Sequence, residues 1–498
     1  MSGPAAVAET HISTVLFDGE LAIKRYKPIR TDFLDHTTVE DRRLDAEREV
    51  ALNRRLAPDV YLGVAEVRGP DGAPCDHLVV MRRLDPARRL STLARAGGAL
   101  GEVEQVARTM AAFHAGAERG PAIDAVATPE ALGQRWEQDL AGLGGTTFGR
   151  AHAGGLAEVA DLARRWLTAR APLLADRIAG GHVCDGQGDL LADDIFCLDD
   201  GPRILDCLAF DDGLRRGDVV ADLAFLAMDL EHLGRPDLAD RLWATYRSAT
   251  GEAHPDSLAD LYVAQRALVR SLVHALRADQ LAESPAGADR AADETAAATE
   301  FLDLALARLR RAEPRLVLVG GSPGTGKSTL AAALATETGW EVLRSDLVRR
   351  DIGPRRDARR DPPGAVETGA YAPTVTDEVY AALLERARDL LGAGRSVVLD
   401  ASWRTAAHRR EAVALAGATR APPHPPRCGA PQGGGPAPAR PPAPHRTHPA
   451  EATPEVADWI AARFEPWPEA VEIDTSGERS DSVRRAQTAL EPSPSDVK

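Results

Sequence analysis

The chain has 498 residues, of which 44% are apolar and 27% are charged, and its formal net charge is −15. This length predicts two or three domains, and the composition is typical of a soluble globular protein. The acidic balance argues against a general nucleic-acid partner or an anionic membrane surface.

Cysteine usage and the N-terminus bear on where the protein works. The cysteines are five, an odd number, and form no C-x-x-C pair, so neither a disulfide frame nor a zinc site is expected. The first residues lack the basic and apolar run of a signal peptide, and no apolar run approaches the ~20 residues of a membrane span. We expect a soluble, cytoplasmic protein.

The first half of the chain predicts a small β-rich lobe followed by a larger helical one. A hairpin is expected over residues 13–27, because Asp18-Gly19 is a turn dipeptide between two apolar runs. A charged helix over 38–56 and strands over 60–67 and 77–81 complete the small lobe. Residues 84–101 read as a loose connection. The later elements are helices at 102–114, 130–140, 155–178, 219–230, 238–249 and 258–281, with a hairpin of strands at 194–198 and 203–208.

Polar residues stand at defined places in this layout. Lys24 ends the apolar run Leu21-Ala22-Ile23, and Glu49 lies in the following helix. Asp189 lies in the segment QGDL, Asp194 follows five residues later, and Asp206 lies in the segment Ile204-Leu205-Asp206. The alternative interpretation is that Asp189 and Asp206 are solvated acids that flank a hairpin.

Taken in order, these pieces resemble the aminoglycoside phosphotransferase-like kinases over roughly residues 13–283. The resemblance implies a protein-kinase-like bilobal fold in which Lys24 contacts ATP and pairs with Glu49. It implies that Asp189 accepts the proton of a substrate hydroxyl and that Asp194 and Asp206 bind Mg²⁺.

Two positions depart from that family's pattern. Gln187 stands where the family has His, and Asp194 stands where it has Asn. An Asp can still offer oxygen to a hard cation, and Gln187 can hydrogen-bond the loop backbone. The departures leave open a domain that binds ATP without turning it over.

Residues 284–313 shift to an Ala-, Asp- and Glu-rich composition and then become amphipathic. They predict a linker that runs into a docking helix, which Pro314 ends. Residues 314–498 are expected to form a second domain.

The segment Gly321–Ser328 in this second domain has the spacing G-x-x-x-x-G-K-S of a phosphate-binding loop. Glycines let consecutive N–H groups point at phosphate oxygens, and the helix that follows adds its positive dipole end. Lys327 is expected to reach the β- and γ-phosphates, and the Ser328 hydroxyl to hold Mg²⁺. The predicted nucleotide-binding residues are Gly321, Ser322, Pro323, Gly324, Thr325, Gly326, Lys327, Ser328 and Thr329.

Two acids follow strands near this loop. Asp400 ends the apolar strand Ser396–Asp400, where a second Mg²⁺ ligand belongs. Asp346 follows the strand Trp340–Arg344. The series resembles small-molecule P-loop kinases near gluconate and shikimate kinase, and ATP-binding proteins of the AAA type. That resemblance implies that Asp346 contacts substrate or acts as a base, although a helix cap is an equally open role.

Residues 420–450 are anomalous, because the tract Arg420–Pro449 is rich in Pro and contains no Asp, Glu, Val, Ile, Leu or Met. We expect this segment to be disordered and to replace the fifth strand of a parallel sheet. The loss would leave the strand Val471–Asp474 without a pairing partner. Two origins are open: a natural Pro-rich insertion, or a stretch read in a shifted frame, which the replacement of a core strand favours.

The sequence therefore predicts two domains of class α+β and α/β: a kinase-like bilobal fold and a P-loop kinase-type parallel sheet flanked by helices. The expected function is ATP-dependent phosphoryl transfer, with Mg²⁺, to a small hydroxylated molecule. The alternative is a non-catalytic ATP sensor with a pseudokinase-like N-terminal domain. No nucleic-acid or membrane partner is expected, and the sequence does not set the oligomeric state.

Overall fold

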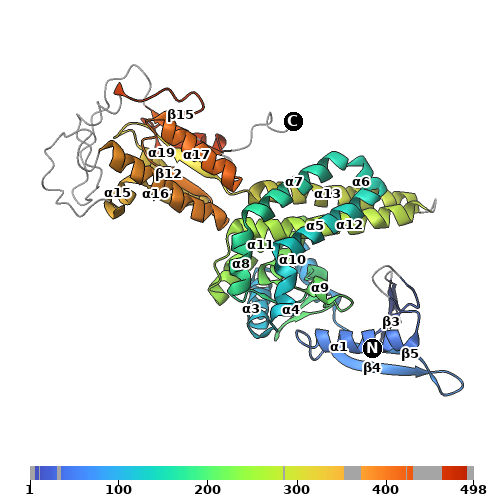
Figure 1. Cartoon of the computed structure of the whole chain (residues 1–498). Helices are drawn as coiled ribbons and strands as arrows, with labels where there is room; N and C mark the ends of the chain where they lie inside the picture. The colour runs from blue at the N-terminus through green and yellow to red at the C-terminus, as the bar shows by residue number, and fades with distance from the viewer. Residues whose placement is uncertain are drawn as a thin grey trace. The chain divides into compact units, whose positions relative to one another are not determined.

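The computed structural model describes residues 6–9, 12–30, 35–283, 287–352, 372–421, 423–424, 426–429 and 462–490. The chain divides into two compact units (Figure 1). Unit 1 comprises residues 1–254 and 258–312, and unit 2 comprises residues 255–257 and 313–498. In the described part of the chain, no helix combines the length and apolarity needed to cross a membrane.

Unit 1 begins with an antiparallel five-stranded sheet of order β1-β2-β3-β5-β4. Its strands are β1 (Ala6–Glu9), β2 (Ser13–Asp18), β3 (Leu21–Tyr26), β4 (Tyr61–Arg68) and β5 (Pro74–Arg82). The predicted hairpin over 13–27 is confirmed, and Gly19 takes the positive φ of +56° that its turn requires.

Helix α1 (Val39–Asn53) begins where the sequence offers a cap, because the Thr38 hydroxyl accepts a hydrogen bond from the Asp41 N–H at 3.1 Å. The core of this lobe joins alternate residues of β3 to residues four apart on α1. These residues are Ala22, Tyr26, Ala46 and Val50. The arrangement fixes β3 and α1 side by side.

The helical lobe of unit 1 has one large apolar core. Its helices are α2 (Leu90–Arg95), α3 (Leu100–Gly116), α4 (Pro121–Asp124), α5 (Pro129–Gly145), α6 (Thr147–Ala151), α7 (Ala153–Ala169), α8 (Ala171–Ala179), α9 (Asp212–Arg215), α10 (Val219–His232), α11 (Pro236–Thr250), α12 (Asp256–Ala282) and α13 (Ala288–Ala312). Short 3₁₀ turns are η1 (Pro86–Arg88), η2 (Ala125–Ala127) and η3 (Ala192–Asp194). The bilobal arrangement that the sequence predicts is confirmed.

Two short antiparallel pairs carry the loops of the helical lobe. They are β6 (Val183–Asp185) with β9 (Arg216–Asp218), and β7 (Ile195–Leu198) with β8 (Gly201–Ile204). The predicted second strand of the hairpin, 203–208, ends early at Ile204. Asp206 has a positive φ of +56°, which breaks the extended backbone.

The segment 84–101 is not the loose connection predicted from the sequence, because it contains η1 and α2. Leu90 and Ala94 of α2 are almost fully buried, 0% and 1% exposed, and join the main core. Helix α13, in the segment predicted as linker and docking helix, buries Phe301 and Leu302 in that same core. It therefore packs on unit 1.

Unit 2 contains a parallel sheet of order β11-β12-β10-β13. The strands are β10 (Leu316–Val319), β11 (Glu341–Arg344), β12 (Val397–Asp400) and β13 (Pro423–His424). The helices are α14 (Lys327–Thr338), α15 (Ser345–Ile352), α16 (Pro373–Gly392), α17 (Ala406–Thr419) and α19 (Arg479–Thr488). One core joins the sheet to α16 and α17, and another joins it to α14 and α19, so helices cover both faces.

The prediction that the fifth strand is absent was wrong. Strand β13 pairs with β10, and β14 (Pro426–Gly429) pairs in parallel with β15 (Val471–Asp474). Backbone of the Pro-rich tract thus pairs with β10 through β13, and β14 forms a separate two-stranded sheet with β15, so β15 has a partner. Proline lacks an N–H but keeps its carbonyl, so it can take part in a ladder wherever its nitrogen is not the required donor.

The disorder expected for 420–450 is contradicted for the residues that form β13 and β14. The rest of that prediction falls on residues 430–450, which lie outside the described residues. The frame-shift hypothesis loses its structural premise, the missing strand, and stays a prediction that resequencing of these codons tests.

Candidate nucleotide sites

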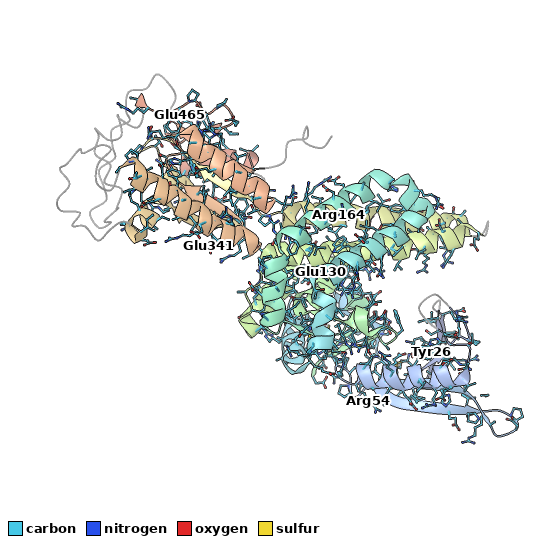
Figure 2. The ribbon with its side chains drawn as sticks, viewed as in Figure 1. Tyr26, Arg54, Glu130, Arg164, Glu341 and Glu465 are labelled. Carbon is cyan, nitrogen blue, oxygen red and sulfur yellow. The ribbon has the colours of Figure 1, made fainter. Side chains whose placement is uncertain are left out.

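The first site lies between the two lobes of unit 1, where β3 and α1 bring Lys24 to Glu49. Lys24 Nζ donates to Glu49 Oε1 at 2.9 Å and lies 3.5 Å from Asp206 Oδ1. Glu49 is 2% exposed and also accepts from the hydroxyl of Tyr26, the residue labelled in Figure 2. Burial opposes the charge of Lys24, but the carboxylates of Glu49 and Asp206 outweigh it and raise the lysine pKa. Lys24 therefore stays cationic and can attract an anion.

Asp189, Asp194 and Asp206 influence one another electrostatically beside that lysine. Burial, with the charge of Asp206, raises the pKa of Asp189 to about 6. Burial, together with the charges of Asp206 and Asp189, raises the pKa of Asp194 well above its usual value. Carboxylates crowded in this way are stabilised by a cation, and oxygen ligands suit Mg²⁺.

The described residues contain no group of three or more His, Cys, Asp or Glu placed to hold a metal ion by themselves. Proteins usually hold Mg²⁺ through one or two carboxylates together with substrate phosphates. Asp206, whose side chain is 57% exposed, and Asp194 are the residues that fit such a role.

Gln187 braces the loop that carries Asp189. Its side chain is fully buried, its Nε2 donates to the Leu205 carbonyl at 2.8 Å, and its Oε1 accepts from the Asp189 N–H at 2.9 Å. One side chain thus joins the Asp189 loop to the strand end that carries Asp206. Gln187 stands where the aminoglycoside phosphotransferase-like kinases have His, and in this chain it has a structural role.

Asp222 on α10 holds the same loop through hydrogen bonds to its backbone. Its two oxygens accept from the backbone N–H groups of Gln187 and Gly188 at 2.7 and 2.8 Å. His114 on α3 lies 3.2 Å from Asp222, and these contacts together hold the pKa of Asp222 low although the residue is buried. A Cβ at Gly186 would stand 2.3 Å from Asp222 Oδ2, so this approach needs glycine.

Sequence reasoning missed the residues that join the two lobes. Arg55, just beyond α1, donates to Asp185 Oδ1 at 2.7 Å and to the Gly186 carbonyl at 2.6 Å. Asn53 accepts from the Cys207 N–H at 2.9 Å. The partners are 130 or more residues apart in sequence, so no local pattern marks them.

The second site is the loop between β10 and α14 in unit 2. Gly321, Gly324 and Gly326 have positive φ values of 133°, 80° and 85°, which explains why glycines stand there. Gly326 caps α14, and the Leu330 N–H donates to its carbonyl at 2.9 Å. Lys327 Nζ donates to the Ser322 carbonyl at 2.7 Å, across the concave side of the loop. The predicted strand, loop and helix are confirmed in this order.

The remaining predicted loop residues differ in their surroundings. Thr325 donates its hydroxyl to the Ser322 carbonyl at 2.8 Å, Pro323 is half-buried, and Thr329 is exposed on α14. Sequence reasoning missed Thr475, whose hydroxyl donates to the Thr325 carbonyl at 2.6 Å. Thr475 directly follows β15, so the pairing of β15 with β14 positions Thr475 against the loop.

Arg344 lies between the two predicted Mg²⁺ ligands of unit 2. Its Nη2 lies 3.4 Å from Ser328 Oγ and its Nε lies 3.3 Å from Asp400 Oδ2. Burial raises the pKa of Asp400, while the Ser328 hydroxyl and the charges of Lys327 and Arg344 oppose that rise. Asp346 lies in the first turn of α15, and its charge adds to the rise in the pKa of Asp400. The structure thus brings Ser328, Asp400 and Asp346 to one edge of the sheet.

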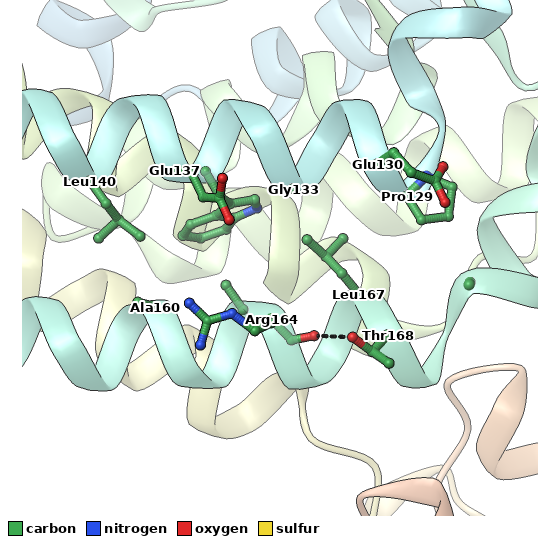
Figure 3. Close-up of a pocket in the computed structure, with 12 residues that line it drawn as sticks. Pro129, Glu130, Gly133, Glu137, Leu140, Ala160, Arg164, Leu167 and Thr168 are labelled. Atoms are coloured by element: carbon green, nitrogen blue, oxygen red, sulfur yellow. Dashed lines mark hydrogen bonds between the residues drawn. The ribbon is translucent and has the colours of Figure 1, made fainter.

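A separate cavity of about 340 Å³ opens between α5 and α7 (Figure 3). Glu130, Glu137 and Leu140 border it from α5, and Arg164 borders it from α7. None of the predicted site residues lines it.

Comparisons with known proteins found similarities to several proteins. Residues 316–467 match a family described as an AAA domain, which implies a nucleotide-binding P-loop domain. A choline/ethanolamine kinase family protein from Mesorhizobium loti is 17% identical, with 62% of this chain and 93% of that chain covered and a TM-score of 0.38. A gluconokinase from Sinorhizobium meliloti is 19% identical, with coverages of 36% and 91% and a TM-score of 0.26.

Two mycobacterial proteins match along nearly the whole chain. The Uncharacterized protein Rv2004c of Mycobacterium tuberculosis is 39% identical over 500 residues, which cover 96% of this chain and 94% of that protein. The Uncharacterized protein Mb2027c of Mycobacterium bovis matches with the same identity and coverage. The chain belongs to the family that these two proteins represent.

Proposed function

We propose that the protein is an ATP-dependent phosphotransferase whose unit 1 phosphorylates a small hydroxylated molecule. The observation that carries this proposal is the convergence of Lys24, Asp189 and Asp206 from both lobes. Lys24 lies 3.5 Å from Asp206 and is held by a buried Glu49 at 2.9 Å. A lysine that stays cationic thus lies beside Asp206, whose charge also raises the pKa of Asp189.

Each residue has a role in such a transfer. Lys24 attracts the phosphates of ATP, and Glu49 fixes its position. The acceptor hydroxyl oxygen bonds to the γ-phosphorus, the bond from that phosphorus to the β–γ bridging oxygen breaks, and Asp189 takes the hydroxyl proton while ADP leaves. Asp194 and Asp206 would hold Mg²⁺, which neutralises phosphate charge when bound.

Unit 2 provides a second nucleotide site in this proposal. The backbone N–H groups of the glycine loop and Lys327 would bind the ATP phosphates, and Ser328 with Asp400 would hold Mg²⁺. Asp346 stands on the same edge of the sheet, where it could contact an acceptor or take its proton. Because Arg344 lies between Ser328 and Asp400, metal binding there would require this side chain to move or to turn to the phosphates.

A non-catalytic ATP sensor is the second candidate. It is favoured by the observation that Arg344 already lies 3.3 Å from Asp400. Such a protein would bind ATP in either unit and release no ADP.

ADP formation with ATP and Mg²⁺ separates the two candidates. The wild type, Asp189→Ala and Lys327→Ala are compared at equal concentration, with a metabolite extract as the source of acceptor. We expect Asp189→Ala to abolish the acceptor-dependent part of turnover, because no group then takes the hydroxyl proton. Turnover that neither substitution lowers would refute the phosphotransferase.

A further inference from the structure

Helix α12 carries buried polar atoms that the fold leaves without hydrogen bonds. Tyr262, Gln265 and Arg266 lie at spacings of three and four residues, so they share one face of the helix. They are 2%, 3% and 9% exposed. In the part of the chain that the structure describes, Tyr262 Oη, Gln265 Nε2 and Arg266 Nε find no hydrogen-bond partner. Such groups are costly to bury unless a ligand satisfies them.

Arg266 lies beside the Asp189 loop. Its guanidinium stands over the Phe225 ring, 4.8 Å from the ring centre. Phe225 is three residues beyond Asp222 on α10, and Asp222 binds the loop backbone at Gln187 and Gly188. The charges of Arg266 and Asp189 act on each other, lowering the pKa of the carboxyl.

A second arginine approaches the same place from α5. Arg135 Nη2 donates to the carbonyl of Gly213, which lies in the segment that follows Asp206. Burial and the positive charge of Arg135 both lower the pKa of Arg266, so the two guanidinium groups repel each other.

The nearby acid does not cancel this charge by direct contact. Asp139 lies one turn beyond Arg135 on α5, and its Oδ2 has no hydrogen-bond partner. No ion pair joins Asp139 to Arg135 or Arg266 within the described residues, and burial raises its pKa to about 6 despite both positive charges. The positive charges of Arg266 and Arg135 are thus not cancelled by an ion pair with Asp139.

We propose that the acceptor of unit 1 carries an anionic group, a phosphate or a carboxylate, that Arg266 and Arg135 bind while its hydroxyl faces Asp189. Guanidinium groups offer paired N–H donors that match both anions. Gln265 and Tyr262 supply further donors on the same helix face. The inference rests on the phosphotransferase function and narrows its substrate class.

Calorimetry on the full chain tests this with four small hydroxylated probes. Glycerol 3-phosphate and glycerate carry the two anions, glycerol is neutral, and ethanolamine is cationic. The chain carries Lys327→Ala, so that the glycine loop of unit 2 does not take up phosphate. We expect binding of at least one anionic probe and none of glycerol or ethanolamine. The anion that binds distinguishes a phosphate acceptor from a carboxylate acceptor.

The arginine variants locate the binding. Arg266→Gln should weaken the anion by about tenfold or more, since a charge-assisted hydrogen bond is lost, and Arg135→Gln should act in the same direction. Arg277→Gln is the matched control, because Arg277 lies on the same helix, is exposed and pairs with Glu294 at 3.0 Å. Arg266→Gln removes a buried charge without an acid partner, so the apo variant should melt no earlier than the wild type.

The outcomes separate this inference from the proposed function. Failure of both anions to bind, equal binding in Arg266→Gln, or preferential binding of ethanolamine overturns the inference. Asp189-dependent phosphorylation of a neutral or cationic acceptor also overturns the anion-site inference, but it supports the phosphotransferase function. Anion binding that depends on Arg266, without any phosphoryl transfer, supports the anion site and refutes the phosphotransferase.

Discussion

The side-chain amide of Gln187 donates to the backbone carbonyl of Leu205 at 2.8 Å, eighteen residues along the chain. Its carbonyl oxygen accepts from the Asp189 N–H at 2.9 Å. These two hydrogen bonds connect the loop that carries Asp189, the candidate base, to the backbone next to Asp206, the candidate metal ligand.

Replacing Gln187 by Ala should therefore loosen both ends of this connection. The change leaves the Leu205 carbonyl and the Asp189 N–H without their partner in a buried place, which costs about 1–3 kcal/mol of unfolding free energy. Because Asp189 loses its brace, kcat should fall more than KM for the acceptor rises. Urea unfolding and steady-state kinetics measure the two effects.

Gln187→His is the control for that experiment, since imidazole can also bond the loop backbone. It should retain more activity than Gln187→Ala. Equal stability and equal kcat in Gln187→Ala and the wild type would show that the two hydrogen bonds do not position Asp189.

The pH dependence of unit 1 follows from the Asp189 carboxyl, whose pKa is raised to about 6 by burial and by the charge of Asp206. Only the deprotonated form accepts a proton, so kcat/KM should rise with pH through about 6 and then level off. Arg270 lowers this pKa, so Arg270→Gln should move the rise to higher pH. A profile that is flat between pH 5 and 8 would contradict the assignment of Asp189 as base.

Asp185 should stabilise unit 1 in a pH-dependent way. Burial would raise its pKa, but hydrogen bonds from Arg215 and Arg55 outweigh burial and hold the pKa at about 2. The folded pKa lies below the ordinary value of about 3.9, so the contribution is fully present above about pH 4. It is lost as the pH falls towards 2.

Asp185→Asn tests this, because it leaves two arginines facing an uncharged group. The free energy of unfolding should drop by about 3 kcal/mol at pH 7. The difference from the wild type should shrink in acid, as the wild-type carboxyl also becomes protonated. A difference that is constant from pH 7 to pH 3 would refute the electrostatic explanation.

Gly320, just before the glycine loop of unit 2, has no room for a side chain. A Cβ there would lie 2.3 Å from Trp467 Cζ3 and 3.3 Å from Trp403 Cδ1, in a place where both rings are buried. Gly320→Ala should lower the free energy of unfolding of unit 2 by about 2 kcal/mol. Tryptophan fluorescence during unfolding measures this change.

The control is Gly417→Ala, an exposed glycine in α17 whose added Cβ meets nothing within 4 Å. It should stabilise by about 0.5–1 kcal/mol, because alanine loses less backbone entropy in a helix. A neutral Gly320→Ala would show that the two tryptophans shift easily.

Local patterns predicted the parts of the fold that depend on neighbouring residues. The strand, glycine loop and helix around Lys327 follow from spacing, since each glycine there takes a positive φ. The hairpin over 13–27 follows from its turn residues. The proximity of Lys24 to Glu49 was reachable only through the resemblance, and the catalytic roles of both stay predictions.

Other features depend on contacts that sequence spacing does not encode. Arg55 finds Asp185 at 2.7 Å across 130 residues, and Gln187 finds Leu205 across a hairpin. The loss of the fifth strand was inferred from side-chain composition, whereas β13 and β14 pair through their backbone. Helix α2 was missed because its Leu90 is buried by distant helices and its own segment is rich in arginine.

The central claim is that unit 1 transfers phosphate through Asp189. Its most direct measurement follows the label from ATP labelled at the γ-phosphate into small molecules of a metabolite extract, using mass spectrometry. We predict a labelled product that persists in Lys327→Ala, in which only the unit 2 loop is altered, and disappears in Asp189→Asn. A product that forms equally in Asp189→Asn, or that disappears only in Lys327→Ala, would contradict the claim.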